Sequence, residues 1–254
     1  MTRVIKIGGR AQGDAALAPA LVAARAAGEP LCVVHGGGDE VTALQRALGQ
    51  EPVFVNGRRA TSPEELSLVR MVLSGTVNKR LVGAWLNAGL PAVGISGEDG
   101  NLLSCDLFGD GSLGAVGQPR SSNPAVLHAL IDAGFVPVIS PVGRFAHDGS
   151  GCNVNGDDAA AAIAGALGAS ELLLVADVDG FRDASGATVA ALDADTAAAH
   201  IANGVATGGM IAKLEAALRA LDHGVTRVRI GGVAAIADPA RGTVITRAPI
   251  AATH

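Results

Sequence analysis

Short apolar runs alternate along this chain with segments in which apolar residues recur at helical spacing. Strands that alternate with helices in this way predict βαβ units, in which parallel strands form one sheet covered by helices on both faces. The helical stripes end at glycines such as Gly49 and Gly224, which is typical of helix C-termini. The predicted strands are Val4–Ile7, Leu31–His35, Ala92–Ile95, Val136–Ser140, Glu171–Ala176 and Val225–Ile230.

The composition agrees with a buried parallel sheet. Hydrophobic residues make up 49% of the 254 residues but aromatic residues only 2%, so Ala, Val, Leu and Ile must form the core. This length suits a single α/β domain over residues 1–254. Within this domain, a weaker boundary is predicted near residue 165, between an N-terminal lobe, 1–165, and a C-terminal lobe, 166–254. The Gly-, Ser- and Asp-rich stretch Asp99–Ser122 predicts a hairpin or excursion at the rim.

Charge and targeting features argue against several classes of protein. The formal net charge is -5 and no basic stripe occurs, so a nucleic-acid partner is not expected. Cys32, Cys105 and Cys152 form no zinc-binding spacing, and an odd number without pattern suits a reducing compartment. The N-terminus does not resemble a signal peptide, and no apolar run reaches membrane-spanning length. We therefore expect a cytoplasmic protein with no membrane partner.

Two glycine-rich turns follow the first two predicted strands. In Lys6–Ile7–Gly8–Gly9 the glycine N–H groups could approach a phosphate while the lysine adds positive charge, although a tight turn beside a solvated lysine is the simpler interpretation. His35–Gly36–Gly37–Gly38 precedes a helix for which Asp39 is the predicted N-cap, and this position favours an anion cradle. Neither turn has the G-x-G-x-x-G or G-x-x-x-x-G-K-[ST] pattern, so the predicted phosphate site is of neither the Rossmann nor the Walker type.

Four further motifs lie near predicted strand or helix ends. Asn56–Thr61 holds two arginines that could fork a carboxylate, and Cys152–Asp158 leads into an Ala-rich helix. Asp177–Phe181 follows an apolar strand, and Thr207–Lys213 enters a helix with a lysine one turn inside it. Each motif alone has an ordinary explanation, such as surface arginines, helix capping or a solvated lysine. Their shared position at the edge where α/β sheets collect ligands favours a binding site.

In the order and spacing of KxGG, HGGG, NGxR-x-T, NVNxD and GGMxxK, the chain resembles the amino-acid kinase family, and within it the N-acetylglutamate kinases. The resemblance runs from Lys6 to Ile245. It implies a three-layer αβα sandwich with a central, mostly parallel open sheet, an N-terminal lobe that binds the acyl amino acid and a C-terminal lobe that binds ATP. It also implies phosphorylation of the γ-carboxylate of N-acetyl-L-glutamate, the second step of arginine biosynthesis.

The resemblance further implies roles for single residues. Lys6 and Lys213 match the two lysines that stabilise the transferring phosphoryl group, and Asp157 matches the aspartate that organises both. Arg59 matches the arginine that clamps the α-carboxylate. The other implied substrate contacts are Gly37, Gly38 and Asn153. The implied contacts to ATP are Gly8, Gly9, Asp177, Val178, Asp179, Gly180, Phe181, Arg182, Val205, Ala206 and Thr207. No protein metal ligand is implied, because Mg²⁺ is expected to be held mainly by the nucleotide.

The expected reaction needs no general base, because the attacking γ-carboxylate is already ionised at neutral pH. His35 is therefore expected to be a buried or supporting residue. Two departures from the family pattern leave the proposed catalytic groups in place. Ala176 stands where Ser or Thr is commoner, and Gly156–Asp157–Asp158 replaces the commoner Ala-Asp-Gln. The chain also begins almost directly at the first strand, without the N-terminal helix that links arginine-inhibited relatives into hexamers, which implies an arginine-insensitive homodimer.

Three alternatives remain open. Sibling kinases phosphorylate N-succinylglutamate, carrier-linked aminoadipate or aspartate; the turn at Asn56–Arg59 and the NVNGD segment favour an acylglutamate over the carrier-linked substrate but do not fix the acyl group. A non-catalytic acidic-amino-acid sensor could share the fold, but it would not need both Lys6 and Lys213. A nicotinamide dehydrogenase would need the missing G-x-G-x-x-G pattern.

Overall fold

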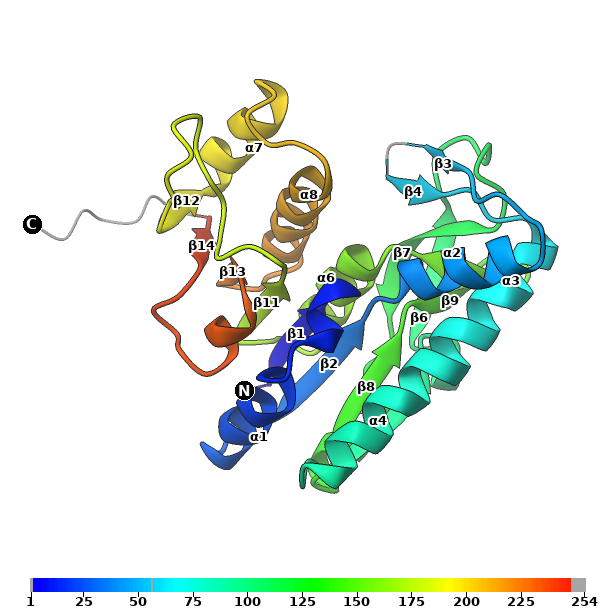
Figure 1. The fold of residues 1–254 in the computed structure, drawn as a ribbon, viewed down its shortest axis with the longest axis horizontal. Helices are drawn as coiled ribbons and strands as arrows, with labels where there is room; N and C mark the ends of the chain where they lie inside the picture. The colour runs from blue at the N-terminus through cyan, green and yellow to red at the C-terminus, as the bar shows by residue number, and fades with distance from the viewer. Residues whose placement is uncertain (1, 56, 248–254) are drawn as a thin grey trace, which may run out of the picture.

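The computed structural model describes residues 2–55 and 57–247, so Asn56 of the predicted arginine turn lies outside the described residues. Its centre is an eight-stranded sheet with the order β12-β14-β13-β11-β1-β2-β8-β5 (Figure 1). All neighbouring pairs are parallel except β13 and β14. These strands are β1 (Arg3–Ile7), β2 (Leu31–His35), β5 (Ala92–Ser96), β8 (Val136–Ser140), β11 (Glu171–Val175), β12 (Ala191–Asp193), β13 (Val228–Gly231) and β14 (Thr243–Thr246).

Helices contribute to a hydrophobic core on each face of this sheet. Alternate residues of a strand point to opposite faces, and in β11 Leu172 and Leu174 enter one core while Leu173 and Val175 enter the other. The first core includes α5 (Ala125–Asp132), α6 (Gly156–Ala166), α7 (Ala194–Ala202) and α8 (Gly209–Asp222). The second includes α1 (Leu17–Ala26), α2 (Gly38–Ala47), α3 (Pro63–Arg70) and α4 (Asn78–Asn87). The predicted three-layer α/β architecture is therefore confirmed.

Beside the sheet lies a small closed barrel that the strand prediction did not include. It is formed by β6 (Leu103–Leu107), β7 (Val116–Ser122), β9 (Val142–Phe145) and β10 (Gly151–Val154). Strands β6 and β7 pair antiparallel, which confirms the hairpin predicted within Asp99–Ser122. Above the barrel, β3 (Phe54–Val55) and β4 (Arg58–Arg59) form a second, very short hairpin (Figure 1).

Irregular helical turns connect several of these elements. Met71–Val77 has π-helical geometry and joins α3 to α4 in one continuous helical run from Pro63 to Asn87. Short 3₁₀ turns occupy Arg10–Gly13, Asp99–Asn101 and Val233–Ile236. Within the described ranges, no helix is both long enough and apolar enough to cross a membrane.

Two local predictions are wrong for identifiable reasons. Strand β13 begins at Val228 rather than Val225, because the N–H of Val225 bonds the carbonyl of Ala220 and completes the C-terminal turn of α8. Asp39 is not the N-cap of α2, since the helix already begins at Gly38 and Gly37 holds the cap position. Gly37 has φ +151°, and a Cβ there would lie 2.8 Å from Cδ2 of Leu73, so a side chain is not tolerated at this turn.

Candidate active site

Lys6 and Asp157 meet behind the carboxyl end of the sheet. Lys6 lies near the end of β1, and its Nζ is 2.8 Å from Oδ1 of Asp157 in the first turn of α6. Both residues are buried. Gly156 makes this approach possible, because a Cβ at that position would lie only 3.2 Å from Cε of Lys6.

Lys213 joins the same carboxylate from the other side. It lies on α8, and its Nζ is 3.2 Å from Oδ2 and 3.4 Å from Oδ1 of Asp157. The structure thus brings together three residues that are more than 50 positions apart in the sequence. With two ammonium groups and one carboxylate, this group, here named the Lys–Asp–Lys triad, has a net charge of +1.

Burial and pairing act in opposite directions on the triad. Burial disfavours the ionised carboxylate of Asp157, but the charges of Lys6 and Lys213 outweigh it and lower the pKa of Asp157 to about 2. Burial and the neighbouring charge of Lys6 lower the pKa of Lys213, while Asp157 opposes that shift. The carboxylate is therefore ionised at neutral pH and holds two like charges close to one point.

Asn155 fixes the position of this carboxylate. Its Oδ1 accepts hydrogen bonds from the N–H of Asp157, at 2.8 Å, and of Asp158, at 3.3 Å, so Asn155 is the N-cap of α6. The cap is therefore Asn155 and not Asp157, whose carboxylate contacts both lysines.

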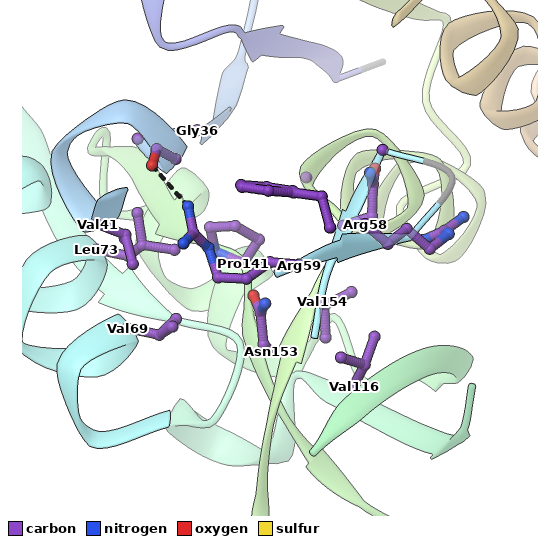
Figure 2. Close-up of a pocket in the computed structure, with 16 residues that line it drawn as sticks. Gly36, Val41, Arg58, Arg59, Val69, Leu73, Val116, Pro141, Asn153 and Val154 are labelled. Atoms are coloured by element: carbon purple, nitrogen blue, oxygen red, sulfur yellow. Dashed lines mark hydrogen bonds between the residues drawn. The ribbon is translucent and has the colours of Figure 1, made fainter. Parts of the chain in front are cut away.

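A cavity of about 160 Å³ lies beside the triad, between the HGGG turn, the β3–β4 hairpin and the barrel. Arg59 and Asn153 both line it, and Figure 2 shows their side chains at its centre. The Arg59 guanidinium donates to the carbonyl of Gly38 at 2.9 Å and to Oγ1 of Thr42 at 2.7 Å, and it also bonds Gln45. Nδ2 of Asn153 donates to Oγ1 of Thr61 at 3.0 Å.

Much of the remaining wall of this cavity is apolar. The apolar side chains on the wall are Val41, Phe54, Val69, Leu73, Val116, Pro141 and Val154. Arginine and asparagine side chains within a largely apolar wall suit a small carboxylate ligand that also carries an apolar group.

The HGGG turn forms the edge of the cavity nearest the triad. No described residue accepts a hydrogen bond from the N–H groups of Gly9, Gly37 or Gly38, which leaves these donors available at the start of a helix. His35 supports the turn from behind, with Nδ1 2.7 Å from the carbonyl oxygen of Gly36 and Nε2 3.1 Å from Nδ2 of Asn78. Burial lowers the pKa of His35 to about 4, so the ring is neutral at physiological pH, and its predicted buried position is confirmed.

A larger cavity of about 520 Å³ opens on the other side of Gly38. Gly38 lines both cavities, so they meet next to the triad. Lys213 lines the larger one directly. Of the residues predicted to bind the nucleotide, those on its wall are Gly8, Gly9, Asp177, Val178 and Thr207.

A neighbouring hollow of about 680 Å³ continues from the larger cavity and includes Asp179 and Arg182. The remaining predicted nucleotide residues, Gly180, Phe181, Val205 and Ala206, line neither space. Phe181 is buried, and its ring centroid lies 4.8 Å from that of His200, so it supports the loop from inside.

Some cavity residues were absent from the sequence prediction. Arg10 lines both the larger cavity and the hollow, and its Nη1 lies 3.0 Å from Oδ2 of Asp177, across the mouth. Arg58, one of the two arginines that the sequence singled out, lines the smaller cavity next to Arg59, although only Arg59 was given a role there. For Arg10, the available signal in the sequence was its position directly after the Lys-x-Gly-Gly turn.

Known proteins resemble this chain in sequence and in fold. The family model described as "Amino acid kinase family" matches residues 1–232. An acetylglutamate kinase from Paracoccus denitrificans is 48% identical over 231 residues, which cover 89% of this chain and 76% of that protein. One from Chloroflexus aurantiacus is 43% identical over 238 residues, covering 92% and 93%. The crystal structure of smu.665 from Streptococcus mutans has a TM-score of 0.88 at 28% identity, covering 97% and 99%.

The depressed pKa of Asp157 predicts an acid-dependent stability. A carboxylate whose pKa is lower in the folded than in the unfolded chain stabilises the fold above the unfolded value, and this contribution is lost as the pH falls through the folded value. With a shift from 3.8 to about 2, we expect the wild-type chain to lose about 2 kcal/mol from this group between pH 4 and pH 2. Asp157→Asn should be less stable at pH 7 and should lack this part of the pH dependence.

Urea unfolding followed by fluorescence of the single, buried Trp85 measures this difference. Asp132→Asn, at an exposed position, is the matched control and should follow the wild type at every pH. If the free energy of unfolding varied with pH in the same way for the wild type and Asp157→Asn across pH 2–7, the low pKa assigned to Asp157 would be contradicted.

Proposed function

Because this chain belongs to the amino acid kinase family, we propose that it transfers the γ-phosphoryl group of ATP to the γ-carboxylate of N-acetyl-L-glutamate. The products are N-acetyl-L-glutamyl 5-phosphate and ADP, which is the second step of arginine biosynthesis. The relatives named acetylglutamate kinase support this substrate. The observation that carries the proposal is the position of the Lys–Asp–Lys triad between two cavities. Arg59 lines the smaller cavity, and Lys213 and the glycines of the Lys-x-Gly-Gly turn line the larger one.

In this reaction a carboxylate oxygen attacks the γ-phosphorus, and the bond from that phosphorus to the β–γ bridging oxygen breaks. The nucleophile is already ionised at neutral pH, so no side chain has to remove a proton. The difficulty is the approach of an anion to the polyanionic end of ATP. Lys6 and Lys213 offset this repulsion, and Asp157 holds both of them in place while leaving a net positive charge.

The small cavity would orient the acceptor. Arg59 would hold the α-carboxylate through its planar guanidinium, and Asn153 would bond the amide of the acyl group. The apolar wall would contact the acyl chain, and the N–H groups of Gly37 and Gly38 would face the γ-carboxylate. Holding the acceptor and ATP in this geometry lowers the entropic cost of bringing the carboxylate to the γ-phosphorus.

The larger cavity would hold the nucleotide. Gly8 and Gly9 would contact the phosphates, while Asp177, Val178, Asp179 and Arg182 would lie along the rest of ATP. Gly180, Phe181, Val205, Ala206 and Thr207 complete the proposed nucleotide segment. Residues 1–165 would then act as the acyl amino-acid lobe and residues 166–254 as the ATP lobe.

Magnesium is assigned to the nucleotide rather than to the chain. Both carboxylate oxygens of Asp157 are paired with lysines. Among residues 2–55 and 57–247, no group of three or more His, Cys, Asp or Glu side chains could hold a metal ion. Mg²⁺ bound to the phosphates adds positive charge there, and the lysines act beside it.

A panel of acceptors separates this proposal from its alternatives. ADP release should be stimulated by N-acetyl-L-glutamate more than by N-succinylglutamate, aminoadipate or aspartate. If aspartate stimulated ADP release and N-acetylglutamate did not, the chain would be a sibling kinase with a different acceptor. If the chain bound acidic amino acids but released no ADP with any of them, it would be a non-catalytic sensor.

Replacing Lys213 tests its role in transfer. Lys213→Met keeps much of the apolar stem and removes the charge, so kcat should fall about 10²–10³-fold, the loss expected for one group that stabilises developing charge. The dissociation constant for N-acetylglutamate should change only a few-fold, because Lys213 lines the nucleotide cavity and not the small one. Steady-state kinetics and calorimetry measure the two effects, and equal losses would indicate a binding role instead.

Replacing Arg59 tests the orientation of the acceptor. Arg59→Lys keeps the charge but loses the planar fork, so KM for N-acetylglutamate should rise about tenfold or more while KM for ATP changes little. Arg120→Lys, in an exposed ion pair with Asp106, is the control and should behave as the wild type. A larger effect on the KM for ATP than on that for N-acetylglutamate would contradict the assignment.

We also propose that two copies associate and that the enzyme acts in the cytoplasm. Met71 and Leu86 lie on the continuous run from Pro63 to Asn87 and are 56% and 52% exposed. Covering such apolar side chains favours association. Light scattering should therefore give about twice the chain mass of 25.1 kDa, and a mass equal to that of one chain would exclude the dimer.

A further inference from the structure

Asp158, next to Asp157, is the centre of a second buried ionic group. Its side chain is only 1% exposed, and two arginines reach it from different parts of the fold. Nη1 of Arg58 lies 2.8 Å from Oδ2, and Nη2 of Arg219 bonds Oδ1. Neither catalysis nor substrate binding, as argued above, uses this carboxylate.

The first arginine ties the β3–β4 hairpin to α6. Arg58 is the first residue of β4, and its Cζ also lies 4.2 Å from the ring centroid of Phe108 on the barrel side. Its neighbour Arg59 reaches in the other direction, to Gly38 and Thr42 on α2. The short hairpin is therefore held over the small cavity by one arginine on each side.

The second arginine ties α8 to the same point. Arg219 lies six residues after Lys213 on α8, or about 9 Å along the helix axis. Its other charged neighbour is Glu215, at 3.9 Å, and within the described residues its Nε has no hydrogen-bond partner. Asp158 is thus the main partner that fixes this side chain. Helix α8 is attached to the first turn of α6 twice, through Lys213 to Asp157 and through Arg219 to Asp158.

We infer that Asp158 is a positioning residue that links the hairpin over the acceptor cavity to the helix that carries Lys213. Each carboxylate oxygen of Asp158 pairs with one arginine, Oδ1 with Arg219 and Oδ2 with Arg58. A displacement of α8 would therefore move Arg219, reorient the carboxylate and shift Arg58. The orientation of Arg59, the next residue along β4, then depends on α8. The kinetic part of this inference rests on the proposed function, whereas its structural part does not.

Arg219→Gln is the sharpest variant, because Arg219 lines neither the acceptor cavity nor the nucleotide cavity. The substitution removes the ion pair between Arg219 and Asp158 and keeps the one between Arg58 and Asp158. We expect the KM for N-acetylglutamate to rise about tenfold, the loss expected for one hydrogen bond between charged groups, with a smaller change in the KM for ATP. Asp158→Asn weakens the contacts with both Arg58 and Arg219, so it should raise the KM for N-acetylglutamate further.

The matched control is Arg247→Gln. Arg247 also contacts α8, at Leu221 and Asp222, but it is exposed and its ion pair is with Asp222 and not with Asp158. It should leave the KM values within about twofold of the wild type, as expected for an exposed ion pair. A rise after Arg219→Gln no larger than that after Arg247→Gln would overturn the inference.

A second measurement does not depend on the substrate. The N–H of Ala60 bonds the carbonyl of Val53 at 2.9 Å and closes the base of the hairpin. Its hydrogen exchange should be about tenfold faster in Arg219→Gln than in the wild type or Arg247→Gln. Unchanged exchange would overturn the link, even in an active enzyme. Failure of the wild type to release ADP with any acceptor would instead refute the proposed function and leave this exchange result to decide the inference.

Discussion

Two ammonium groups that share one buried carboxylate are the interaction on which the rest of this site depends. Without Asp157, Lys6 and Lys213 would repel each other in a poorly hydrated space, and one of them would lose its proton or move away. With it, the two lysines stay charged and keep a net positive charge at the point where both cavities meet. The neighbouring carboxylate of Asp158 does not cancel this charge, because it pairs with Arg58 and Arg219 instead.

The parallel sheet supplies what this interaction requires. Strand β1 lies between β2 and β11, so the Lys-x-Gly-Gly turn lies next to the ends of both neighbours. Helix α6 follows the barrel strand β10, and its capped N-terminus puts Asp157 behind those strand ends. Helix α8 then crosses to the same point from the C-terminal part of the chain. Because β1 pairs directly with β11, one sheet joins the parts of the chain before and after residue 165.

The sequence predicted the regular part of this structure better than the irregular part. Buried parallel strands such as Leu31–His35 and Val136–Ser140 are marked by local apolar runs and were placed correctly. The barrel was missed as a unit because its closure pairs β6 with β9 and β7 with β10 across long stretches of chain, and such pairing has no local pattern. Gly37 rather than Asp39 holds the cap position, and its positive φ and the closeness of Leu73, which only the tertiary structure reveals, disfavour a side chain there.

The two consecutive aspartates of α6 show why a local motif cannot assign roles by itself. Successive residues of a helix point about 100° apart, so Asp157 and Asp158 face different neighbours although both lie in one capped turn. Asp157 meets two lysines and Asp158 meets two arginines. Lysine presents a compact charge that can approach a phosphoryl group, whereas arginine makes fixed, planar bonds that suit the support of a hairpin and a helix. The chemistry of the partners, and not the aspartates themselves, separates the carboxylate that we propose for catalysis from the one that we propose for positioning.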